Sequence, residues 1–453
     1  MADTKQKEKD IFENMPVRKA VLTLAVPTVI SQLIVLIYNL ADTWFIGQTG
    51  DPLQVAAVTV SYPIFMLLGG LGNLFGIGGG SLISRLLGRG DQANAGKIGT
   101  FVIWASTVAT LFYSLLILGF GRQALQVLGT GGETLGYARQ YLLWTVVIGG
   151  IPMVLNQVLA NIVRAQGRAR TASIGMSVGG ILNVALDPLF IFGLHMNVAG
   201  AALATCISNV VSVLYLFGHI IRTRKESVVR LTVFPQRIRL SYVAEVFSVG
   251  TPAALQIVLA SVSNSVMLRL MSGYVESAVS GLGIAQKIEM IPFQIVQGLS
   301  SGVLPLIAYN YASGNRKRMD SAVRFSLAAG FAISVILFAT VELSAPQLVR
   351  FFISDAATVE YGAVFTRLRC ISLPFINIEF MLISVFQGIG GAKQAFVLSF
   401  FRKGIFDLPL MMLANMLWPM YGLMLTGPVM EFLGGSLAVF LYRRQNLADR
   451  RVM

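Results

Sequence analysis

Residues 17–46 read VRKAVLTLAVPTVISQLIVLIYNLADTWFI, and this stretch decides the class of fold. No charged residue lies between Lys19 and Asp42. An apolar run of about 20 residues is long enough for a helix to cross the roughly 30 Å hydrocarbon layer of a membrane. We therefore predict that this stretch is a transmembrane helix.

Comparable apolar stretches recur along the whole chain, and Pro, Gly and charged residues mark their ends. Of the 453 residues, 55% are hydrophobic and only 12% are charged, which is too little polar surface for a soluble protein of this length. We predict an all-α integral membrane protein with twelve transmembrane helices. Their predicted positions are 17–46, 54–87, 95–118, 134–160, 171–194, 199–222, 242–271, 277–309, 320–342, 358–387, 394–418 and 422–442.

The distribution of basic residues favours an even number of helices with both termini in the cytoplasm. Cytoplasmic loops of membrane proteins carry an excess of Lys and Arg. With this topology most of the 35 Lys and Arg residues fall on the cytoplasmic side, and only Arg122 and Arg350 fall in loops on the other side. The net charge of +14 is then explained by topology rather than by nucleic-acid binding. We expect the cell membrane as location, which is the inner membrane in a Gram-negative organism.

The two halves of the chain resemble each other at an offset of about 222 to 225 positions, as in LGRGD at 87–91 and YASGN at 311–315. Two repeats of six helices share one orientation in the membrane and are related by an axis along its normal. We predict two six-helix lobes with a substrate site between them. The expected division is a cytoplasmic segment 1–16, an N-lobe 17–222, a cytoplasmic linker 223–241, a C-lobe 242–442 and a cytoplasmic tail 443–453.

Carboxylates at bilayer depth are the main candidate functional groups. A charge there costs about 2.5 to 3.5 kcal/mol on insertion scales, so Asp42 and Asp187 should face a cavity or a partner. Asn39 lies three residues before Asp42, and Asn183 lies four before Asp187, so each pair shares a helix face. Two carboxylates in one dry pocket could hold a proton, and the same oxygen atoms could bind Na⁺. The simpler alternative is that Asp42 caps or kinks its helix and that Asp187 satisfies backbone groups freed by Pro188.

Three stretches together are similar to the multidrug and toxin extrusion (MATE) family: AVP at 25–27, YNLADTWFIG at 38–47, and the segment 164–202. The resemblance spans both halves. It implies a secondary transporter that exports small organic, cationic and amphipathic compounds in exchange for H⁺ or Na⁺, by alternating access of two lobes and without a cofactor. It also implies that four residues line an N-lobe cavity and bind the proton or Na⁺, namely Asp42, Asn183, Asp187 and Thr205, with Asn39 as a further candidate.

Within that family the chain looks closer to the DinF-like branch than to the NorM-like branch. NorM-like members carry an acidic residue midway along the seventh helix, whereas no acidic residue lies between Val246 and Val275 here. Glu379 in the tenth helix would occupy the position of another NorM-like acid. The candidates for a C-lobe cavity are Glu379, Gln256, Arg402 and Asp407, and internal ion pairing is the simpler interpretation for Arg402 and Asp407.

Other classes of function fit the sequence less well. No G-x-x-x-x-G-K-[ST] stretch is present, so a nucleotide-driven pump is excluded, and His195 and His219 each stand alone, which disfavours an intramembrane enzyme. Cys206 and Cys370 lie in apolar segments and are interpreted as packing residues. A flippase for lipid-linked precursors is the alternative, although a more cationic cavity and further helices would be expected of it. The expected partners are the lipid bilayer and small molecules, and a monomer should suffice.

Prolines inside the predicted helices favour kinks, because each removes a backbone hydrogen bond. Helices that bend at such points would suit alternating access. The prolines concerned are Pro27, Pro152, Pro188, Pro252, Pro292, Pro305, Pro374 and Pro409.

Overall fold

The computed structural model of the chain describes residues 9–223, 232, 234 and 236–452. In this part of the chain the secondary structure is entirely helical, which confirms the all-α class. The first half contains α2 (Val17–Gly47), α3 (Pro52–Gly88), α4 (Gln92–Val127), α5 (Gly132–Leu142), α6 (Gly150–Ala165), α7 (Ala169–Pro188) and α8 (Asn197–Arg222). The second half contains α9 (Leu240–Met271), α10 (Glu276–Ala312), α11 (Arg316–Arg350), α12 (Ala356–Cys370), α13 (Leu373–Ile389), α14 (Ala392–Phe400), α15 (Asp407–Leu417) and α16 (Tyr421–Val452).

Helical segments occupy all twelve predicted positions in the described residues, and three of the segments are broken. Among the described residues, nine helices are long and apolar enough to span a membrane, and the count rises to eleven when each of two bent pairs is taken as one span. The bent pairs are α5 with α6, at 46°, and α12 with α13, at 43°. The remaining segment, 392–417, consists of α14, a π-helical turn at Phe401–Ile405 and α15, and it carries four charged residues.

Proline explains where these three segments break. Pro152, Pro374 and Pro409 do not kink a continuous helix as predicted, but lie in the first turn of α6, α13 and α15. A proline in the first turn of a helix removes no intrahelical hydrogen bond, because the N–H groups there have no intrahelical partner. The chain therefore restarts a helix at each of these prolines.

Several helices continue beyond the ends that hydropathy indicated. The predicted cytoplasmic tail 443–453 is helical in its described part, because α16 runs on to Val452. The sequence after Tyr442 contains no glycine or proline and many residues of high helix propensity, so nothing stops the helix where it leaves the membrane. Much of the predicted linker 223–241 and the first half of segment 1–16 lie outside the described residues.

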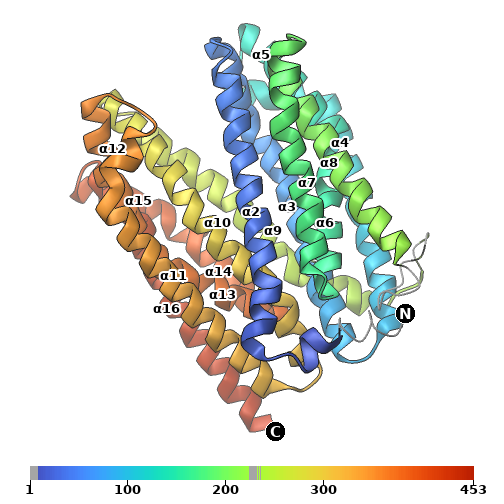
Figure 1. Cartoon of the computed structure of the whole chain (residues 1–453). Coiled ribbons are helices and arrows are strands. Elements are labelled where there is room, and N and C mark those ends of the chain that lie inside the picture. The colour runs from blue at the N-terminus through green and yellow to red at the C-terminus, as the bar shows by residue number, and fades with distance from the viewer. Residues whose placement is uncertain (1–8, 224–231, 233, 235, 453) are drawn as a thin grey trace.

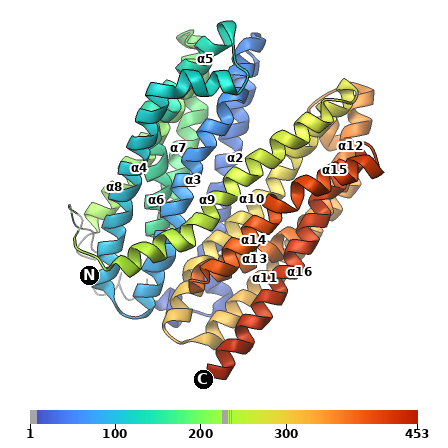
Figure 2. The same ribbon diagram turned by 180° about the vertical axis from the view of Figure 1, so that it is seen from behind.

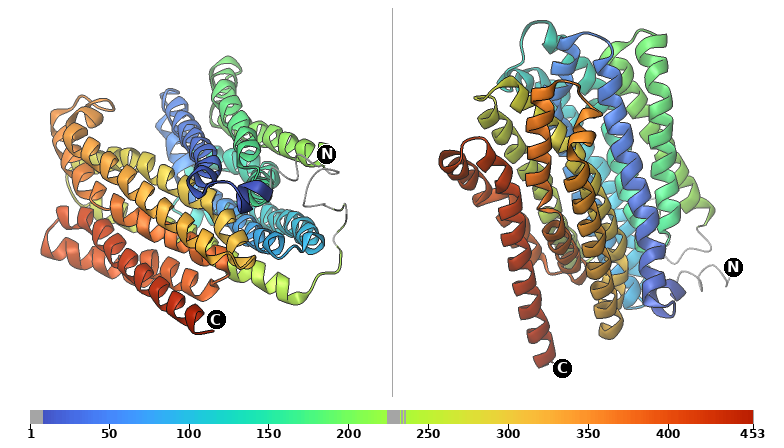
Figure 3. Two further views of the ribbon diagram at one scale, coloured as in Figure 1. Left: turned by 60° about the horizontal axis from the view of Figure 1, so that its bottom comes forward. Right: turned by 60° about the vertical axis from the view of Figure 1, so that its left-hand side comes forward.

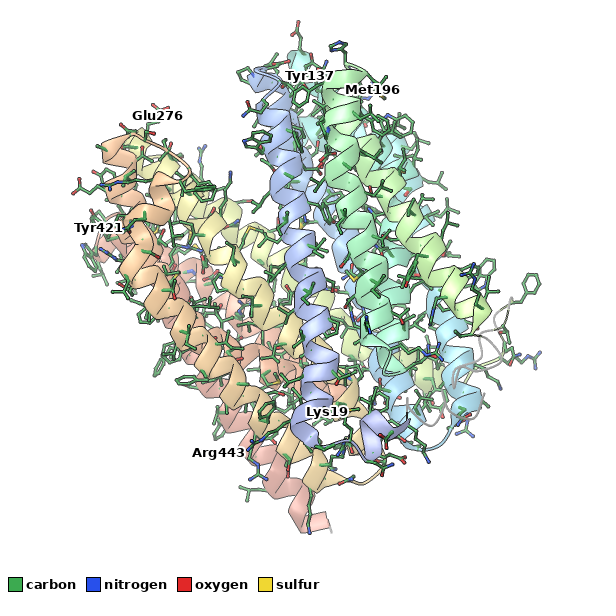
Figure 4. The ribbon with its side chains drawn as sticks, in the orientation of Figure 1. Lys19, Tyr137, Met196, Glu276, Tyr421 and Arg443 are labelled. Carbon is green, nitrogen blue, oxygen red and sulfur yellow. The ribbon has the colours of Figure 1, made fainter. Side chains whose placement is uncertain are left out.

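The helices form two lobes that diverge like the arms of a V (Figures 1 and 2). One lobe contains α2 to α8 and the other contains α9 to α16, and Figure 3 shows the two groups from other directions. Tyr137 and Glu276 mark the separated ends of the lobes, whereas Lys19 and Arg443 lie at the end where the lobes meet (Figure 4). Both described ends of the chain are thus on one side, as an even number of crossings requires.

Two symmetry-related helix crossings join the lobes: α3 packs along α9, and α2 packs along α10. A Cβ atom on Gly78 of α3 would collide with the carbonyl oxygen of Val246 in α9. A Cβ atom on Gly302 of α10 would lie 2.7 Å from the Cα atom of Ala25 in α2. Since 302 − 78 = 224, the two glycines are equivalent at the offset of the sequence repeat. Small residues thus let both pairs of backbones approach closely.

Polar contacts between the lobes gather where the lobes meet. Arg85 of α3 forms an ion pair with Glu245 of α9, and the arginine side chain is only 3% exposed. Nearby, the Ser81 hydroxyl donates to the carbonyl oxygen of Gln387, at 2.5 Å, which ties α3 to α13. These contacts hold the lobes together at this end and leave the other end open.

The short segment before α2 packs against the same end of the C-lobe. The ring of Phe12 is buried and stacks on Tyr309 of α10, with 4.7 Å between the ring centroids. The Tyr309 hydroxyl donates to Glu13 at 2.6 Å, and Arg318 of α11 donates to the carbonyl oxygen of Phe12 at 2.6 Å. The N-terminal segment therefore adds to the closure of this end.

We predict that Gly78→Ala lowers the thermal stability of the detergent-solubilised protein. The added methyl group collides with backbone, and overpacking costs about 1 to 3 kcal/mol, more than the roughly 1 kcal/mol that alanine gains in helix propensity. Gly119→Ala on α4 is the matched control, because nothing lies within 4 Å of its Cβ position. Thermal melting curves of the two variants are compared, and size-exclusion chromatography measures the folded fraction at each temperature. Equal stability of both variants would show that the helix crossing at Gly78 can accommodate a methyl group.

Candidate functional site

Side chains from three helices form a hydrogen-bonded chain inside the N-lobe. The Asn183 amide of α7 donates to the hydroxyl oxygen of Thr205 in α8, at 3.3 Å. The Thr205 hydroxyl in turn donates to Oδ2 of Asp42 in α2, also at 3.3 Å. Asp187 follows Asn183 by one helical turn and is 0% exposed. The structure thus brings together the four residues that the sequence singled out, from positions up to 163 residues apart.

The two carboxylates of this cluster are close and poorly satisfied. The two carboxylates lie close enough to each other for their charges to interact. Oδ1 of Asp42 and both carboxylate oxygens of Asp187 have no hydrogen-bond partner in the described part of the chain. Buried carboxylate oxygens normally find donors, so this arrangement has the capacity to accept a proton or a cation.

The geometry differs from the simpler interpretation of these acids. Asp42 does not cap α2, because the helix ends through backbone bonds of Gln48 while the Asp42 carboxylate accepts from Thr205. Asp187 does not satisfy the backbone groups freed at Pro188, since its oxygen atoms are unpartnered there. The backbone instead widens into a π-helical turn at Leu189–Gly193 directly after Pro188. Single π turns of this kind occur often at functional sites.

Asn39 takes a different position from the rest of the predicted set. Its amide donates to the carbonyl oxygen of Val35 in its own helix, at 2.8 Å, and its side chain is exposed. The structure therefore places Asn39 outside the chain of hydrogen bonds that joins Asp42, Thr205 and Asn183.

A cavity of about 290 Å³ lies between the N-lobe cluster and the C-lobe. Its lining is rich in amides, and two of them continue the polar chain: Asn156 of α6 donates to Asn209 of α8 at 3.0 Å, and Asn209 donates to the backbone carbonyl of Thr205 at 2.9 Å. α9 and α10 contribute lining residues from the other lobe. The amide residues that line this cavity are Gln32, Asn73, Asn156, Gln157, Asn161, Asn183, Asn209, Gln294 and Gln297.

The sequence contains a pattern that indicates this cavity, and a search for carboxylates alone does not find it. In α6, Gln157, Asn161 and Arg164 interrupt an apolar sequence at spacings of four and three residues. Such spacing places them along one face of a helix. A polar face on a transmembrane helix points to a cavity or a partner helix.

A second cavity, of about 270 Å³, lies between the lobes on the side of the open end. Thr43 of α2 and Tyr62 of α3 face Asn264 and Leu268 of α9 across it. Its described lining contains no charged side chain. Both cavities therefore lie between the lobes, where the repeat predicts a substrate site.

The C-lobe contains a buried ionic cluster around Arg402, which is 4% exposed. Its guanidinium group contacts Glu431 of α16 at 2.7 Å and Glu379 of α13 at 3.8 Å. Lys403 pairs with Asp407 at 3.7 Å, and the Ser263 hydroxyl of α9 donates to the same Asp407 carboxylate. Here the acids face basic residues, so the C-lobe acids differ from those of the N-lobe.

This cluster contains three of the four predicted C-lobe residues and adds Glu431. The fourth, Gln256, lies on α9 with its Nε2 atom buried and without a hydrogen bond in the described structure. No described hydrogen bond or ion pair joins it to Arg402. Glu431 was missed, although it is the one acidic residue in the apolar sequence 421–441 and could have been found by the rule applied to Asp42.

Among the described residues, no three His, Cys, Asp or Glu side chains come together as a metal site. Two lobes with polar cavities between them, in a membrane-spanning bundle, define a class of protein: the multi-pass transporters. Similarity to known proteins shows which family of transporters the chain belongs to.

The MatE family model matches residues 27–189 and 252–413, one block in each lobe. The chain is 32% identical over 443 residues to the multidrug export protein MepA of Staphylococcus saprophyticus, covering 97% of each sequence. It is 31% identical over 442 residues to MepA of Staphylococcus aureus, again covering 97% of each. The chain therefore belongs to the MATE family and is a transporter, not an enzyme.

Solved structures share the fold. A crystal structure of a MATE protein in complex with MaL6 superimposes with a TM-score of 0.92 at 23% identity, covering 99% of this chain and 100% of the other. An outward-facing structure of a multidrug resistance MATE transporter superimposes with a TM-score of 0.90 at 23% identity, covering 96% of this chain and 97% of the other. The two-lobe, all-helical architecture predicted from the sequence is confirmed.

We predict that Arg402→Leu destabilises the protein strongly, and that the double variant Arg402→Leu with Glu431→Leu recovers part of the loss, because the buried Glu379 loses its pairing with Arg402 in both variants. Removing one partner of a buried ion pair costs about 3 to 5 kcal/mol, because the other charge is left uncompensated, whereas an apolar pair can replace both. Thermal unfolding of the two single variants and the double variant gives the coupling. Additive losses in the double variant would show that Arg402 and Glu431 are not energetically paired.

Proposed function

We propose that this chain exports small organic compounds, cationic and amphipathic ones among them, in exchange for H⁺ or Na⁺. The observation that carries the proposal is the pair formed by the half-buried Asp42 and the fully buried Asp187, beside the polar cavity between the lobes. The relatives named multidrug export proteins, at 31 and 32% identity over nearly the full chain, support the class of substrate.

The coupling ion binds, in this proposal, at Asp42, Asp187, Asn183 and Thr205. Two carboxylates that face each other in a buried pocket repel, and a proton shared between them removes the repulsion. The two carboxylates, the Asn183 oxygen and the Thr205 hydroxyl also supply the oxygen ligands that Na⁺ requires. Oδ1 of Asn183, which has no partner in the described residues, is available for this role.

The transport cycle in this proposal depends on two arrangements of the lobes, to which the substrate and the coupling ion bind with different affinities. A cation or proton at the Asp42 and Asp187 pair would remove the negative charge that attracts a cationic substrate, and so would favour its release. By linkage, substrate and coupling ion weaken each other's binding to the same extent. Alternating access then moves the lobes about the crossings of α2 with α10 and α3 with α9.

The proposed orientation places both termini in the cytoplasm, so that the open end of the V faces outward. The excess of Lys and Arg in the loops at the end with the termini supports this topology. The site lies within one chain, which supports a monomer as the working unit. The absence of an acid from residues 246–275, which include most of α9, supports a DinF-like rather than a NorM-like branch. A lipid-linked precursor would need a strongly cationic cavity, whereas Arg164 is the one charged residue in the described lining of the 290 Å³ cavity.

We predict that Asp42→Asn and Asp187→Asn each abolish gradient-driven efflux of ethidium from cells, because each removes one of the two carboxylates that bind the coupling ion. Efflux is followed by fluorescence under imposed H⁺ and Na⁺ gradients, and the gradient that drives it in the wild type identifies the ion. Asp51→Asn is the control: Asp51 caps α3 through the Leu53 N–H at 2.9 Å, and asparagine caps equally well. Full efflux in both variants, at normal expression, would contradict the proposed site.

A second prediction concerns competition between the ion and the substrate. Raising the concentration of the coupling ion should weaken ethidium binding to the purified wild type, and Asp187→Asn should remove that dependence. Fluorescence titrations at several pH values and Na⁺ concentrations test this linkage. Ethidium affinity that is independent of both ions in the wild type would rule out the antagonism on which the cycle depends.

A further inference from the structure

The segment just before α2 connects the two lobes at their closed end. Residues 9–15, which we call the strap, contain a short helix at 9–13 and lead through Pro16 into α2. α2 belongs to the N-lobe, where it packs against α7, so the strap is covalently part of that lobe. The strap nevertheless contacts α10 and α11 of the C-lobe, at the end where the lobes meet (dark blue in Figure 1).

The C-lobe provides a docking site for an aromatic ring of the strap. Phe12 is 2% exposed, and its ring stacks on that of Tyr309 in α10 with 4.7 Å between the ring centroids. The Tyr309 hydroxyl also donates to Glu13, at 2.6 Å. A buried aromatic ring contributes more to such a contact than most other side chains can, so Phe12 is the main anchor of the strap.

The C-lobe also satisfies the backbone at the end of the strap's short helix. The last carbonyl groups of a helix have no intrahelical donor. Arg318 of α11 donates to the carbonyl oxygen of Ile11 at 3.0 Å and to that of Phe12 at 2.6 Å, and Asn310 of α10 donates to the latter at 3.2 Å. A helix this short is not stable by itself in water, so the folded shape of the strap depends on its docking to the C-lobe.

The strap contact has a counterpart in the other repeat. Since 309 − 85 = 224, Tyr309 and Arg85 occupy equivalent positions, and each donates to a glutamate of the other lobe. Arg85 donates to Glu245 in α9, and Tyr309 donates to Glu13 in the strap. Tyr309 also lies where α3 meets α10, because a Cβ atom on Gly88 would collide with its carbonyl oxygen. The closed end therefore has two equivalent contacts between the lobes, one within transmembrane helices and one through the strap.

Opening of the closed end would separate α3 from α10 and would draw the N-lobe away from Tyr309. Only the residues from Asn14 to Pro16 link the short helix to α2, and three residues span at most about 10 Å. The strap therefore cannot stay docked on the C-lobe while α2 moves farther away with the N-lobe.

We propose that the strap is a latch between the lobes: docked on the C-lobe it holds the closed end together, and it leaves its site each time that end opens. This inference rests on the alternating access of the proposed function. It adds that the strength of strap docking sets how often the closed end opens.

Two pairs of spin labels on the full-length protein test the latch. The first pair, at Ala93→Cys in α4 and Arg443→Cys in α16, measures the separation of the lobes at the closed end. The second pair, at Asn14→Cys in the strap and Arg443→Cys, measures whether the strap is docked on the C-lobe. All three sites are exposed, and the native Cys206 and Cys370 are buried.

With the first pair, Phe12→Ala should raise the ratio of open to closed populations at this end by at least about tenfold, because the buried ring stabilises only the closed arrangement. Tyr309→Phe keeps the stacked ring and removes one hydrogen bond, so it should raise the ratio by about threefold to tenfold. Asn14→Ala is the control, because Asn14 is exposed and its side chain makes no described contact, and it should leave the ratio unchanged. A ratio that is unchanged in both Phe12→Ala and Tyr309→Phe would overturn the proposal.

The second pair tests the alternative that the strap stays on the C-lobe throughout. The latch predicts that the long-distance fraction of the strap pair matches that of the lobe pair in the wild type and in each variant. Lobes that separate while the strap distance stays short would show that the strap travels with the C-lobe, and the latch would be wrong. These distances require no substrate, so a wild type that does not export ethidium would contradict the proposed function and still leave the latch open to this test.

Discussion

The close approach of backbone to backbone at two helix crossings is the constraint on which the rest of the structure depends. α3 meets α9 at Gly78, and α2 meets α10 at Gly302, at positions that are equivalent in the two repeats. In a membrane, where lipid is as apolar as a side chain, such close packing is a principal source of helix association. Because these crossings and the Arg85 to Glu245 ion pair hold one end closed, the lobes can diverge at the other end and leave polar cavities between them.

The two repeats share an architecture, but they differ in whether their buried acidic residues are paired with basic ones. In the N-lobe, Asp187 is fully buried with both oxygens unpartnered, next to Asp42. In the C-lobe, the acids around Arg402 are compensated by Arg402 and Lys403. Paired buried charges tend to fix one arrangement, whereas uncompensated ones remain available to a ligand. This difference explains why we assign ion coupling to the N-lobe and a mainly structural role to the C-lobe cluster.

Physical rules applied to the sequence were sufficient for the fold class and for much of the N-lobe cluster. The lengths of the apolar segments predicted the positions of the helices. Helical spacing predicted that Asn183 and Asp187 share a helix face. The role of Thr205 came only from the family resemblance. The breaks before Pro152, Pro374 and Pro409 were not foreseen, because a proline at a helix start and one at a kink have the same sequence signature. Glu431 could have been found from its position in an apolar segment and Arg164 from the polar face of α6, but only packing shows that Glu431 faces Arg402 and that Arg164 lacks a counter-charge in the described part of the chain. The placement of Asn39 outside the cluster is likewise a matter of side-chain direction, which residue spacing leaves open.

The central claim is that the lobes move against each other about the glycine crossings as substrate and coupling ion exchange. The most direct test is a distance distribution between spin labels at the open end, attached to Glu133→Cys in α5 and Glu276→Cys in α10. Both sites are exposed, and the native Cys206 and Cys370 are buried, so labelling is selective. The account predicts a long-distance population that shrinks in favour of a shorter one when the concentrations of the coupling ion and of the substrate are varied. A single distance distribution that is unchanged under all these conditions would contradict it.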